Sequence, residues 1–339
     1  MTMNPIHTTD WIAGVDLGGT KMAVTLANRT GIVCKLQAPV VTTGAPTALA
    51  EQAWDLIAQL CTQQGLARSE VSAVGILTCS PFVKVRQADG NVMREVAAPN
   101  LCGGMAGNPY GLANDWKHFP LESYFVDKVP RVVMENDGVA ILAAERTFGA
   151  LRGSDHCAYA TWSTGVGFGL CVDGKLLAGK RGNAGHGGHM FVSEDRSTQC
   201  GCGNAGDLEA QISGKALARL WQIATNNPAA TTQDLFSAAS QNNTSAVEII
   251  KQAASRMGAA LYNLTVILDL ERIALGGSVF MHHQALLLPM LQAQLQRGMG
   301  ALTQGVELVP TALGDHAGDL GALSLVIPAD WVAGFKASL

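Results

Sequence analysis

The stretch Gly14-Val15-Asp16-Leu17-Gly18-Gly19-Thr20-Lys21 is the part of the sequence that decides the fold. One apolar run, residues 11–15, leads into the glycines, and a second, residues 22–26, follows them at once. This spacing predicts a hairpin turn between two strands rather than the start of a helix. Glycines in such a turn let backbone N–H groups approach an anion without a Cβ in the way. The stretch therefore predicts an anion-binding hairpin.

The side chains of the same stretch suit a metal-bound phosphate. Asp16 ends the first strand, where a carboxylate can hold Mg²⁺, and Thr20 and Lys21 are placed to meet phosphate oxygens. Gly18 and Gly19 supply backbone amides. The alternative is an ordinary glycine-rich hairpin, but the other motifs of the chain favour the phosphate-binding interpretation.

The composition limits the class of protein. A length of 339 residues predicts two domains, and 48% hydrophobic with 15% charged residues indicates a compact globular chain. A net charge of −4 gives no reason to expect nucleic acid or an anionic membrane as a partner. Residues 1–10 lack the basic and apolar regions of a secretory signal, and no apolar run approaches the ~20 residues of a membrane span.

The cysteines agree with a reducing compartment. Most of the eight lie singly in apolar strands or loops, where free buried thiols are usual, as do Cys34, Cys61, Cys157 and Cys171. We therefore expect a cytoplasmic protein without nucleic-acid or membrane partners, and we expect it to form a homodimer.

The order of strands and helices indicates two related halves. In the first half, strands are predicted at 11–15, 22–26, 31–36, 71–77 and 129–134, and helices at 46–64 and 138–148. The pattern restarts with a strand at 158–162, a glycine turn at Ser163–Gly169 and a strand at 170–172. Helices at 208–224, 245–268, 284–297 and 317–327 and strands at 272–275 and 306–310 follow. Such an internal repeat is expected of a duplicated, two-lobed phosphotransferase.

Two further segments carry candidate chemistry. Asn136-Asp137 lies between a strand and a helix, where a carboxylate can accept a proton from a substrate hydroxyl while the amide binds the same substrate. The alternative is that Asp137 only caps the helix. In Ser163–Gly169, hydroxyls and glycine amides form a second candidate nest for an anion, with a tight hairpin as the alternative.

The densest cluster of polar groups lies between residues 185 and 209. His189, Cys200 and Cys202 offer one imidazole and two thiolates, a donor set that suits tetrahedral Zn²⁺. The alternative is two free cysteines in a loop.

Taken together, these features resemble the ROK family of sugar kinases and related repressors, over residues 11–327. The first glycine stretch resembles the first phosphate motif of the family, and Ser163–Gly169 the second. Glu135-Asn136-Asp137 matches its catalytic strand end, Gly276-Gly277-Ser278 resembles its adenosine-side glycines, and residues 317–322 resemble its closing helix.

The resemblance implies an α/β, actin-like (ribonuclease H-like) two-domain fold with ATP and sugar in an interdomain cleft. Residues 1–130 with the C-terminal helix 317–339 would form a small domain, and residues 131–316 a large domain that carries the zinc loop. Asp137 would be the general base. The sugar would be bound by Asn100, Asn136, His186, His189 and Glu209. ATP and Mg²⁺ would be bound by Asp16, Gly18, Gly19, Thr20, Lys21, Ser163, Thr164, Gly165, Gly167, Gly276 and Gly277.

The chain departs from the family pattern at two positions. His186 stands where a sugar-binding Glu is expected, and Asp207 stands where the third zinc cysteine is expected. We expect a structural Zn²⁺ held by His189, Cys200, Cys202 and Asp207, since Asp is a legitimate zinc ligand. A neutral imidazole has one donor and one acceptor where a carboxylate only accepts, so His186 would change the hydrogen bonding to the sugar hydroxyls. A His at this position resembles bacterial N-acetylmannosamine kinases, which favours an amino- or N-acyl-hexose over glucose.

Three functions remain open from the sequence. The first is ATP-dependent phosphorylation of a hexose or an amino- or N-acyl-hexose, with polyphosphate as an alternative donor. A glucokinase proper is the second, and a sugar-binding ROK-type regulator without a DNA-binding domain is the third. The long irregular segment after Pro99-Asn100-Leu101, residues 105–125, fits either a decorated sugar or a plain surface insertion.

Overall fold

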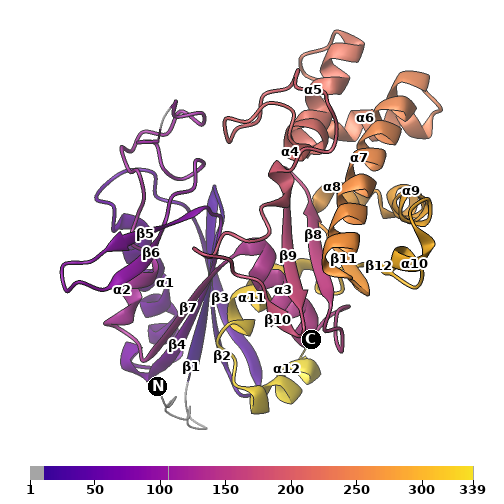
Figure 1. Ribbon diagram of the computed structural model, residues 1–339. Coiled ribbons are helices and arrows are strands. Elements are labelled where there is room, and N and C mark those ends of the chain that lie inside the picture. The colour runs from indigo at the N-terminus through magenta and orange to yellow at the C-terminus, as the bar shows by residue number, and fades with distance from the viewer. Residues whose placement is uncertain (1–10, 106, 339) are drawn as a thin grey trace. The chain divides into compact units, whose positions relative to one another are not determined.

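The computed structural model describes residues 11–105 and 107–338, which divide into two compact units. Unit 1 comprises the described parts of residues 1–149, 178–184 and 313–339, and unit 2 comprises residues 150–177 and 185–312. Each unit is built on a five-stranded sheet with helices packed against it (Figure 1).

The sheet of unit 1 has the strand order β3-β2-β1-β4-β7. β2 is antiparallel to β1 and to β3, whereas β4 is parallel to β1 and to β7. The strands are β1 (Trp11–Leu17), β2 (Lys21–Asn28), β3 (Gly31–Pro39), β4 (Val71–Thr78) and β7 (Arg131–Asn136). A separate hairpin is formed by β5 (Phe82–Arg86) and β6 (Val92–Val96).

Helices cover both faces of this sheet. α1 (Ala48–Gln63) packs on one face and contributes to its main hydrophobic core, next to α2 (Glu122–Val126). On the other face, α3 (Asp137–Thr147), α11 (Ala317–Ser324) and α12 (Val332–Ser338) pack on the sheet. α11 approaches β1 and β4 closely because Gly14 and Gly75 have no side chain, and a Cβ on Gly75 would collide with the Ala322 carbonyl.

The sheet of unit 2 has the strand order β10-β9-β8-β11-β12. The strands are β8 (Cys157–Trp162), β9 (Val166–Val172), β10 (Lys175–Leu176), β11 (Arg272–Gly276) and β12 (Glu307–Pro310). The helices are α4 (Leu208–Ile212), α5 (Gly214–Thr225), α6 (Thr232–Ser240), α7 (Thr244–Leu268), α8 (Ser278–His282), α9 (Gln284–Gln296) and α10 (Gly300–Thr303). Short 3₁₀ turns occur at Arg68–Glu70, Gly187–His189, Gly314–His316 and Ala329–Trp331.

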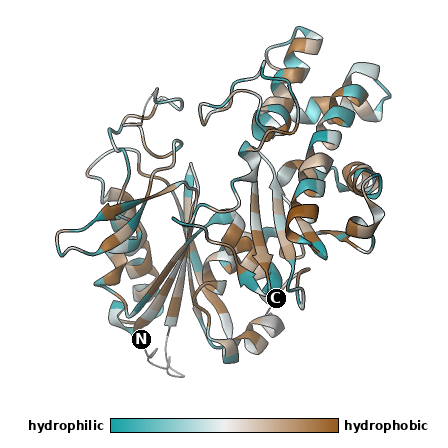
Figure 2. Ribbon diagram, viewed as in Figure 1, coloured by the Kyte–Doolittle hydropathy of each residue, from teal (hydrophilic) through white to brown (hydrophobic). Residues whose placement is uncertain are grey.

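The two sheets share one arrangement. In each, a strand turns back through a glycine-containing hairpin into an antiparallel partner, β1 into β2 and β8 into β9, and also pairs in parallel with a strand from later in the chain. Figure 2 shows that the strands of both sheets are mostly hydrophobic while the outer loops are more hydrophilic. Among the described residues, no helix is long and apolar enough to cross a membrane.

The structure differs from the sequence-based expectations at several points. Residues 131–149 lie in unit 1, because β7 pairs with β4 in its sheet and α3 packs on α11. The second glycine turn is confined to residues 163–165, since β9 begins at Val166 and places Gly167 opposite Thr161. The helix predicted at 208–224 is broken at Ser213, whose hydroxyl accepts from the Ala216 amide and starts α5. α6 was not predicted.

Candidate functional site

The first glycine hairpin of unit 1 forms a tight turn that lies against Asn100, one of the predicted sugar-binding residues. The Gly18 amide donates to the Lys21 carbonyl at 3.0 Å. A Cβ on Gly19 would lie 2.7 Å from Nδ2 of Asn100, so the glycine lets the Asn100 side chain lie against the turn. The structure thus brings the predicted phosphate turn and Asn100 together, although about 80 residues separate them in the sequence.

Asp16, near the end of β1, lies among other carboxylates. Burial, then the nearby carboxylates of Asp319 and Asp137, raises the pKa of Asp16 to about 6, while Lys35 opposes the shift. A Cβ on Gly318 of α11 would collide with Asp16 Oδ2, so this glycine makes room for the carboxylate. Clustered carboxylate oxygens are the donor set that Mg²⁺ prefers, and a divalent cation would relieve their repulsion. The residues therefore fit a magnesium site.

Asp319 is a buried carboxylate that sequence reasoning did not single out. Its Oδ1 accepts from Thr25 Oγ1 at 2.8 Å, and its Oδ2 accepts from Lys35 Nζ at 2.7 Å. Thr25 and Lys35 are neighbours across the sheet, in the same row as Gly14. An acidic residue within the apolar segment 317–327 was the available signal, because a buried carboxylate needs a partner.

Asn136 and Asp137 join β7 to α3. Asn136, not Asp137, is the helix N-cap, because its Oδ1 accepts from the amides of Gly138 at 2.9 Å and Val139 at 3.3 Å. Its Nδ2 donates to Ser80 Oγ at 2.9 Å and to Asp137 Oδ1 at 2.8 Å. Both amide hydrogens of Asn136 are thus engaged, and one of them orients the Asp137 carboxylate.

Cys79, directly after β4, is a further residue that sequence reasoning missed. Burial and the Asp137 carboxylate raise the pKa of its thiol to about 12, while hydrogen bonds with Asn100 and Thr78 act in the opposite direction. A neutral thiol therefore lies near both Asn100 and Asp137. The available signal was its position after a buried strand that is parallel to the one ending at Asn136.

In unit 2, the second glycine turn lies against the Glu209 side chain of α4. Val166 donates its amide to Glu209 Oε2 at 2.8 Å, and a Cβ on Gly165 would lie 2.7 Å from the same oxygen. The Ser163 carbonyl accepts from the Gly214 amide at 2.8 Å, which ties the turn to the start of α5. The structure therefore brings Ser163–Gly165 and Glu209 together, as it does Gly19 and Asn100 in unit 1.

The glycines after β11 are required by the backbone. Gly277 has φ of 86°, which favours glycine, and it precedes α8. A Cβ on Gly277 would lie 2.5 Å from the Trp162 carbonyl, and one on Gly276 would lie 2.6 Å from the Tyr159 hydroxyl. Both positions therefore require a residue without a side chain.

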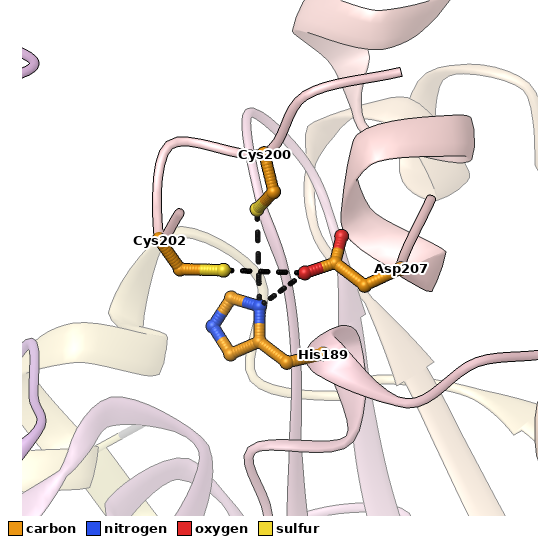
Figure 3. Close-up of side chains that lie close together, drawn as sticks. All are labelled: His189, Cys200, Cys202 and Asp207. Carbon is orange, nitrogen blue, oxygen red and sulfur yellow. Dashed lines mark hydrogen bonds and ion pairs between the residues drawn. The ribbon is translucent and has the colours of Figure 1, made fainter. Parts of the chain in front are cut away.

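The four predicted zinc ligands converge in unit 2 (Figure 3). His189 Nδ1 lies 3.0 Å from Asp207 Oδ2 and 3.9 Å from Cys200 Sγ, and Cys202 Sγ lies 3.3 Å from the same Asp207 oxygen. One ligand atom from each residue lies within 4.8 Å of all the others. Asp207 Oδ1 accepts from the Ala210 amide at 2.8 Å and caps α4, so only Oδ2 is turned into the cluster.

The electrostatics of this cluster also fit a metal. Burial raises the pKa of Asp207, but hydrogen bonds led by that of His189 outweigh it and hold the pKa at about 2. Burial raises the pKa of both the Cys200 and the Cys202 thiols. A carboxylate, an imidazole nitrogen and two thiols that only a cation would ionise are a donor set suited to Zn²⁺.

His186 lies beside this cluster. Its ring centroid is 6.1 Å from that of His189, and both belong to the loop around the 3₁₀ turn Gly187–His189. Gly188 packs this loop onto β9, since a Cβ there would collide with the Val166 carbonyl. Figure 3 shows the second ring nitrogen of His189 pointing away from the other three ligands, so the imidazole can bind a metal on one side and a substrate on the other.

Two sheets of matching order, each with a glycine hairpin beside polar side chains, define an actin-like two-domain protein of the sugar-kinase type. The chain matches the ROK family over residues 12–329, and it belongs to that family. This confirms the resemblance and the fold class that the sequence indicated.

Named relatives include both enzymes and a regulator. A glucokinase from Halalkalibacterium halodurans is 27% identical, over 93% of this chain and 94% of its own. An N-acetylmannosamine kinase from Yersinia pestis is 30% identical, over 92% and 96%. The xylose repressor of Bacillus subtilis is 27% identical, over 93% of this chain and 76% of its own.

Solved structures agree. The ROK hexokinase from Thermus thermophilus superimposes with a TM-score of 0.73 at 28% identity, covering 93% of this chain and 97% of that one. The ROK family glucokinase from Streptomyces griseus, in complex with glucose and AMPPNP, gives 0.68 at 27% identity, over 92% and 97%.

Proposed function

We propose that this protein transfers a phosphoryl group from ATP to a hydroxyl of an amino- or N-acyl-hexose, with Asp137 as the general base. The protein is a carbohydrate kinase of the ROK family, and the proposal concerns the residues that do the chemistry and the sugar that they accept. One observation carries it: Asn136 caps α3 and donates to Asp137 Oδ1 at 2.8 Å, which holds that carboxylate in one orientation.

In the proposed mechanism, Asp137 takes the proton of the attacking hydroxyl. A carboxylate that is already oriented needs less rearrangement when the proton moves. Asn100, held against the Gly19 turn, would bind the sugar in unit 1, and His186, His189 and Glu209 would bind it in unit 2.

The phosphates would be bound by the two glycine turns, with Gly18, Gly19, Thr20 and Lys21 in unit 1 and Ser163, Thr164 and Gly165 in unit 2. Gly276 and Gly277 would lie against the nucleoside. Gly167 lies within β9, so its expected part in phosphate binding would have to come from a strand position. Bound to Asp16, Mg²⁺ would neutralise the charge of the phosphates during transfer.

Zinc would organise the sugar-binding side of unit 2. Held by His189, Cys200, Cys202 and Asp207, Zn²⁺ would supply no reaction chemistry and would only fix the loop. The loop itself places His186 and one face of His189 for the sugar. A neutral His186 tolerates a substituent at C2 that a carboxylate accepting two hydroxyls would exclude.

One named relative supports the proposed sugar and two support other outcomes. The N-acetylmannosamine kinase of Yersinia pestis agrees with an N-acyl sugar. The glucokinase of Halalkalibacterium halodurans favours glucose, and the xylose repressor of Bacillus subtilis favours a regulator that binds sugar without turnover.

A substrate panel separates these outcomes. Purified protein is assayed for ADP release with ATP and Mg²⁺ on glucose, mannose, glucosamine, N-acetylglucosamine and N-acetylmannosamine, with Asp137→Asn as the blank. We expect kcat/KM to be highest for an amino or N-acyl sugar. A highest value for glucose identifies a glucokinase, and sugar binding without any turnover identifies a regulator. A parallel series with polyphosphate in place of ATP tests the donor.

A further inference from the structure

Unit 2 contains an apolar cavity that the proposed reaction does not use. Its volume is about 400 Å³, and it lies among α6, α7, the end of α8 and the start of α9. These helices lie together in the orange to golden part of Figure 1. The volume falls within the range of small-molecule sites. None of the residues that line the cavity is a candidate ligand for sugar, phosphate or zinc.

One wall of the cavity is aromatic and firmly held. The rings of Phe236 and His283 are stacked, with centroids 3.5 Å apart and planes 5° from parallel. Phe236 belongs to the hydrophobic core of unit 2, so packing against that core holds the stacked pair in place. Burial, and then the proximity of His282, lowers the pKa of His283, which keeps the stacked ring neutral and compatible with an apolar ligand.

The polar groups at the cavity favour an anion. The lining includes Lys251 and His282 and no carboxylate. Glu248, one turn before Lys251 on α7, accepts from Gln252 Nε2 at 2.9 Å. Within residues 11–105 and 107–338, the structure shows no ion pair to the Lys251 ammonium. A lysine at the edge of an apolar cavity attracts a ligand with an apolar body and a negative head.

We propose that this cavity binds an amphipathic organic anion, a molecule with a flat or branched apolar body and one carboxylate, sulfonate or phosphate group. The body lies against Phe236, Ile250 and Met290, and the anionic group meets Lys251. The proposal does not depend on the kinase activity, since binding can be measured on the protein alone.

Two dyes with the same aromatic body test the charge preference. 8-Anilino-1-naphthalenesulfonate carries a sulfonate, and N-phenyl-1-naphthylamine does not. Each is titrated into the full-length protein, and fluorescence gives the dissociation constant. Lys251→Met removes the charge and keeps the apolar stem, so we expect it to weaken the sulfonate dye about tenfold and to change the neutral dye less than about twofold. Lys175→Met, an exposed lysine of β10 away from the cavity, is the matched control.

A second pair of variants locates the bound dye. Ala285 lies at the exposed edge of the cavity, so Ala285→Trp fills the space without disturbing the core. We expect this variant to abolish binding of both dyes, whereas Ala224→Trp, at an exposed position of α5, leaves both unchanged. Thermal unfolding confirms that each variant is folded.

Displacement tests the ligand class and the independence of the site. Phenyl phosphate is expected to displace the sulfonate dye, and benzylamine is not. The proposal is overturned if Lys251→Met leaves the affinity for the sulfonate dye unchanged, or if Ala285→Trp leaves both dyes bound. Displacement of the dye by Mg–ADP at its own binding concentration also overturns it, because the cavity would then belong to the nucleotide site.

Discussion

The Asn136 side chain donates to Ser80 Oγ at 2.9 Å while its own Oδ1 caps α3. One residue thereby links the end of β4, the end of β7 and the first turn of the helix that begins with Asp137. The cap gives the residue a role in stability, and the contact with Asp137, the proposed base, predicts a second role in activity. Variants can separate the two roles.

We expect Asn136→Ser to keep most of the stability and to lose activity, whereas Asn136→Ala loses both. Serine is as good an N-cap as asparagine, but its short hydroxyl cannot cap the helix and also reach Ser80 and Asp137. Alanine is expected to lower the free energy of unfolding by about 1 kcal/mol. Denaturant unfolding and steady-state kinetics decide. A purely structural role would be shown if Asn136→Ser kept both its stability and its activity while Asn136→Ala lost both.

Asp137→Asn is expected to lower kcat by about 10²–10⁴-fold and to change the sugar dissociation constant less than about tenfold. The amide keeps the shape and one hydrogen-bonding oxygen but cannot take the proton. Kinetics and isothermal titration with the sugar check both parts. Turnover near that of the unmodified protein would remove Asp137 from the mechanism.

The stability of the magnesium-free protein is expected to depend on pH through Asp16. Burial and the carboxylates of Asp319 and Asp137 raise the pKa of Asp16 from its ordinary value of 3.8 to about 6. Between pH 3.8 and about pH 6, the Asp16 carboxyl keeps a proton in the folded state that it has lost in the unfolded state. This group therefore lowers the free energy of unfolding as the pH rises. The contribution approaches about 2–3 kcal/mol at pH 7.

The measurement is denaturant unfolding in EDTA at pH 4 and pH 7. Asp16→Asn lacks this titration, so its stability relative to the unmodified protein should increase by about 2–3 kcal/mol between the two pH values. Added Mg²⁺ should reduce the difference at pH 7. Parallel pH profiles for the two proteins would contradict the expectation.

One zinc per chain is expected in protein purified without chelator. Asp207→Cys should slow zinc loss to a chelator, because it replaces a hard ligand by a thiolate. It also removes the carboxylate that caps α4, so the metal-free variant should be less stable than the metal-free parent by about 1 kcal/mol. Metal analysis and thermal unfolding with and without zinc test both effects. A metal-free chain with full activity would limit this cluster to an ordinary loop contact.

His186→Glu is expected to shift the ratio of kcat/KM values toward glucose by about 1–3 kcal/mol, because the carboxylate accepts two hydroxyl hydrogen bonds. His186→Gln introduces a side chain of the same shape as glutamate but without the charge, and it should shift the ratio of kcat/KM values less. The comparison uses glucose against the best amino or N-acyl sugar. If the unmodified protein already prefers glucose to every such sugar, the specificity assigned to His186 is wrong.

The fold class and family were predictable because their signals are local. The glycine hairpin at residues 14–21 lies between two apolar runs, and the strand that ends at Asn136 precedes a helix, so each prediction used only neighbouring residues. The zinc candidates were also local, since they fall within residues 189–207. The sequence did not predict helix α6. It also did not predict that the second glycine turn ends at Gly165, because glycine is typical of turns and Gly167 nevertheless lies in strand β9.

Contacts over long sequence separations could not be predicted. Lys35 and Asp319 are 284 positions apart, and their hydrogen bond depends on how α11 lies on the sheet. The contact of Asn100 with Gly19 likewise depends on folding of the whole of unit 1. Burial of these groups, which sets their pKa shifts, is also a property of the folded chain.

The glycines beneath α11 have a consequence for how variants of this protein are interpreted. Gly14 and Gly75 set how closely the helix approaches the sheet, and the same helix presents Gly318 and Asp319 to Asp16. A methyl group on Gly75 would collide with the Ala322 carbonyl, and one on Gly14 would press on the side chains of Ala322 and Leu323, so either would shift α11 relative to Asp16, the proposed magnesium ligand. The milder change, Gly14→Ala, would be classed as a folding defect by its location, yet it would also weaken cation binding in the folded protein.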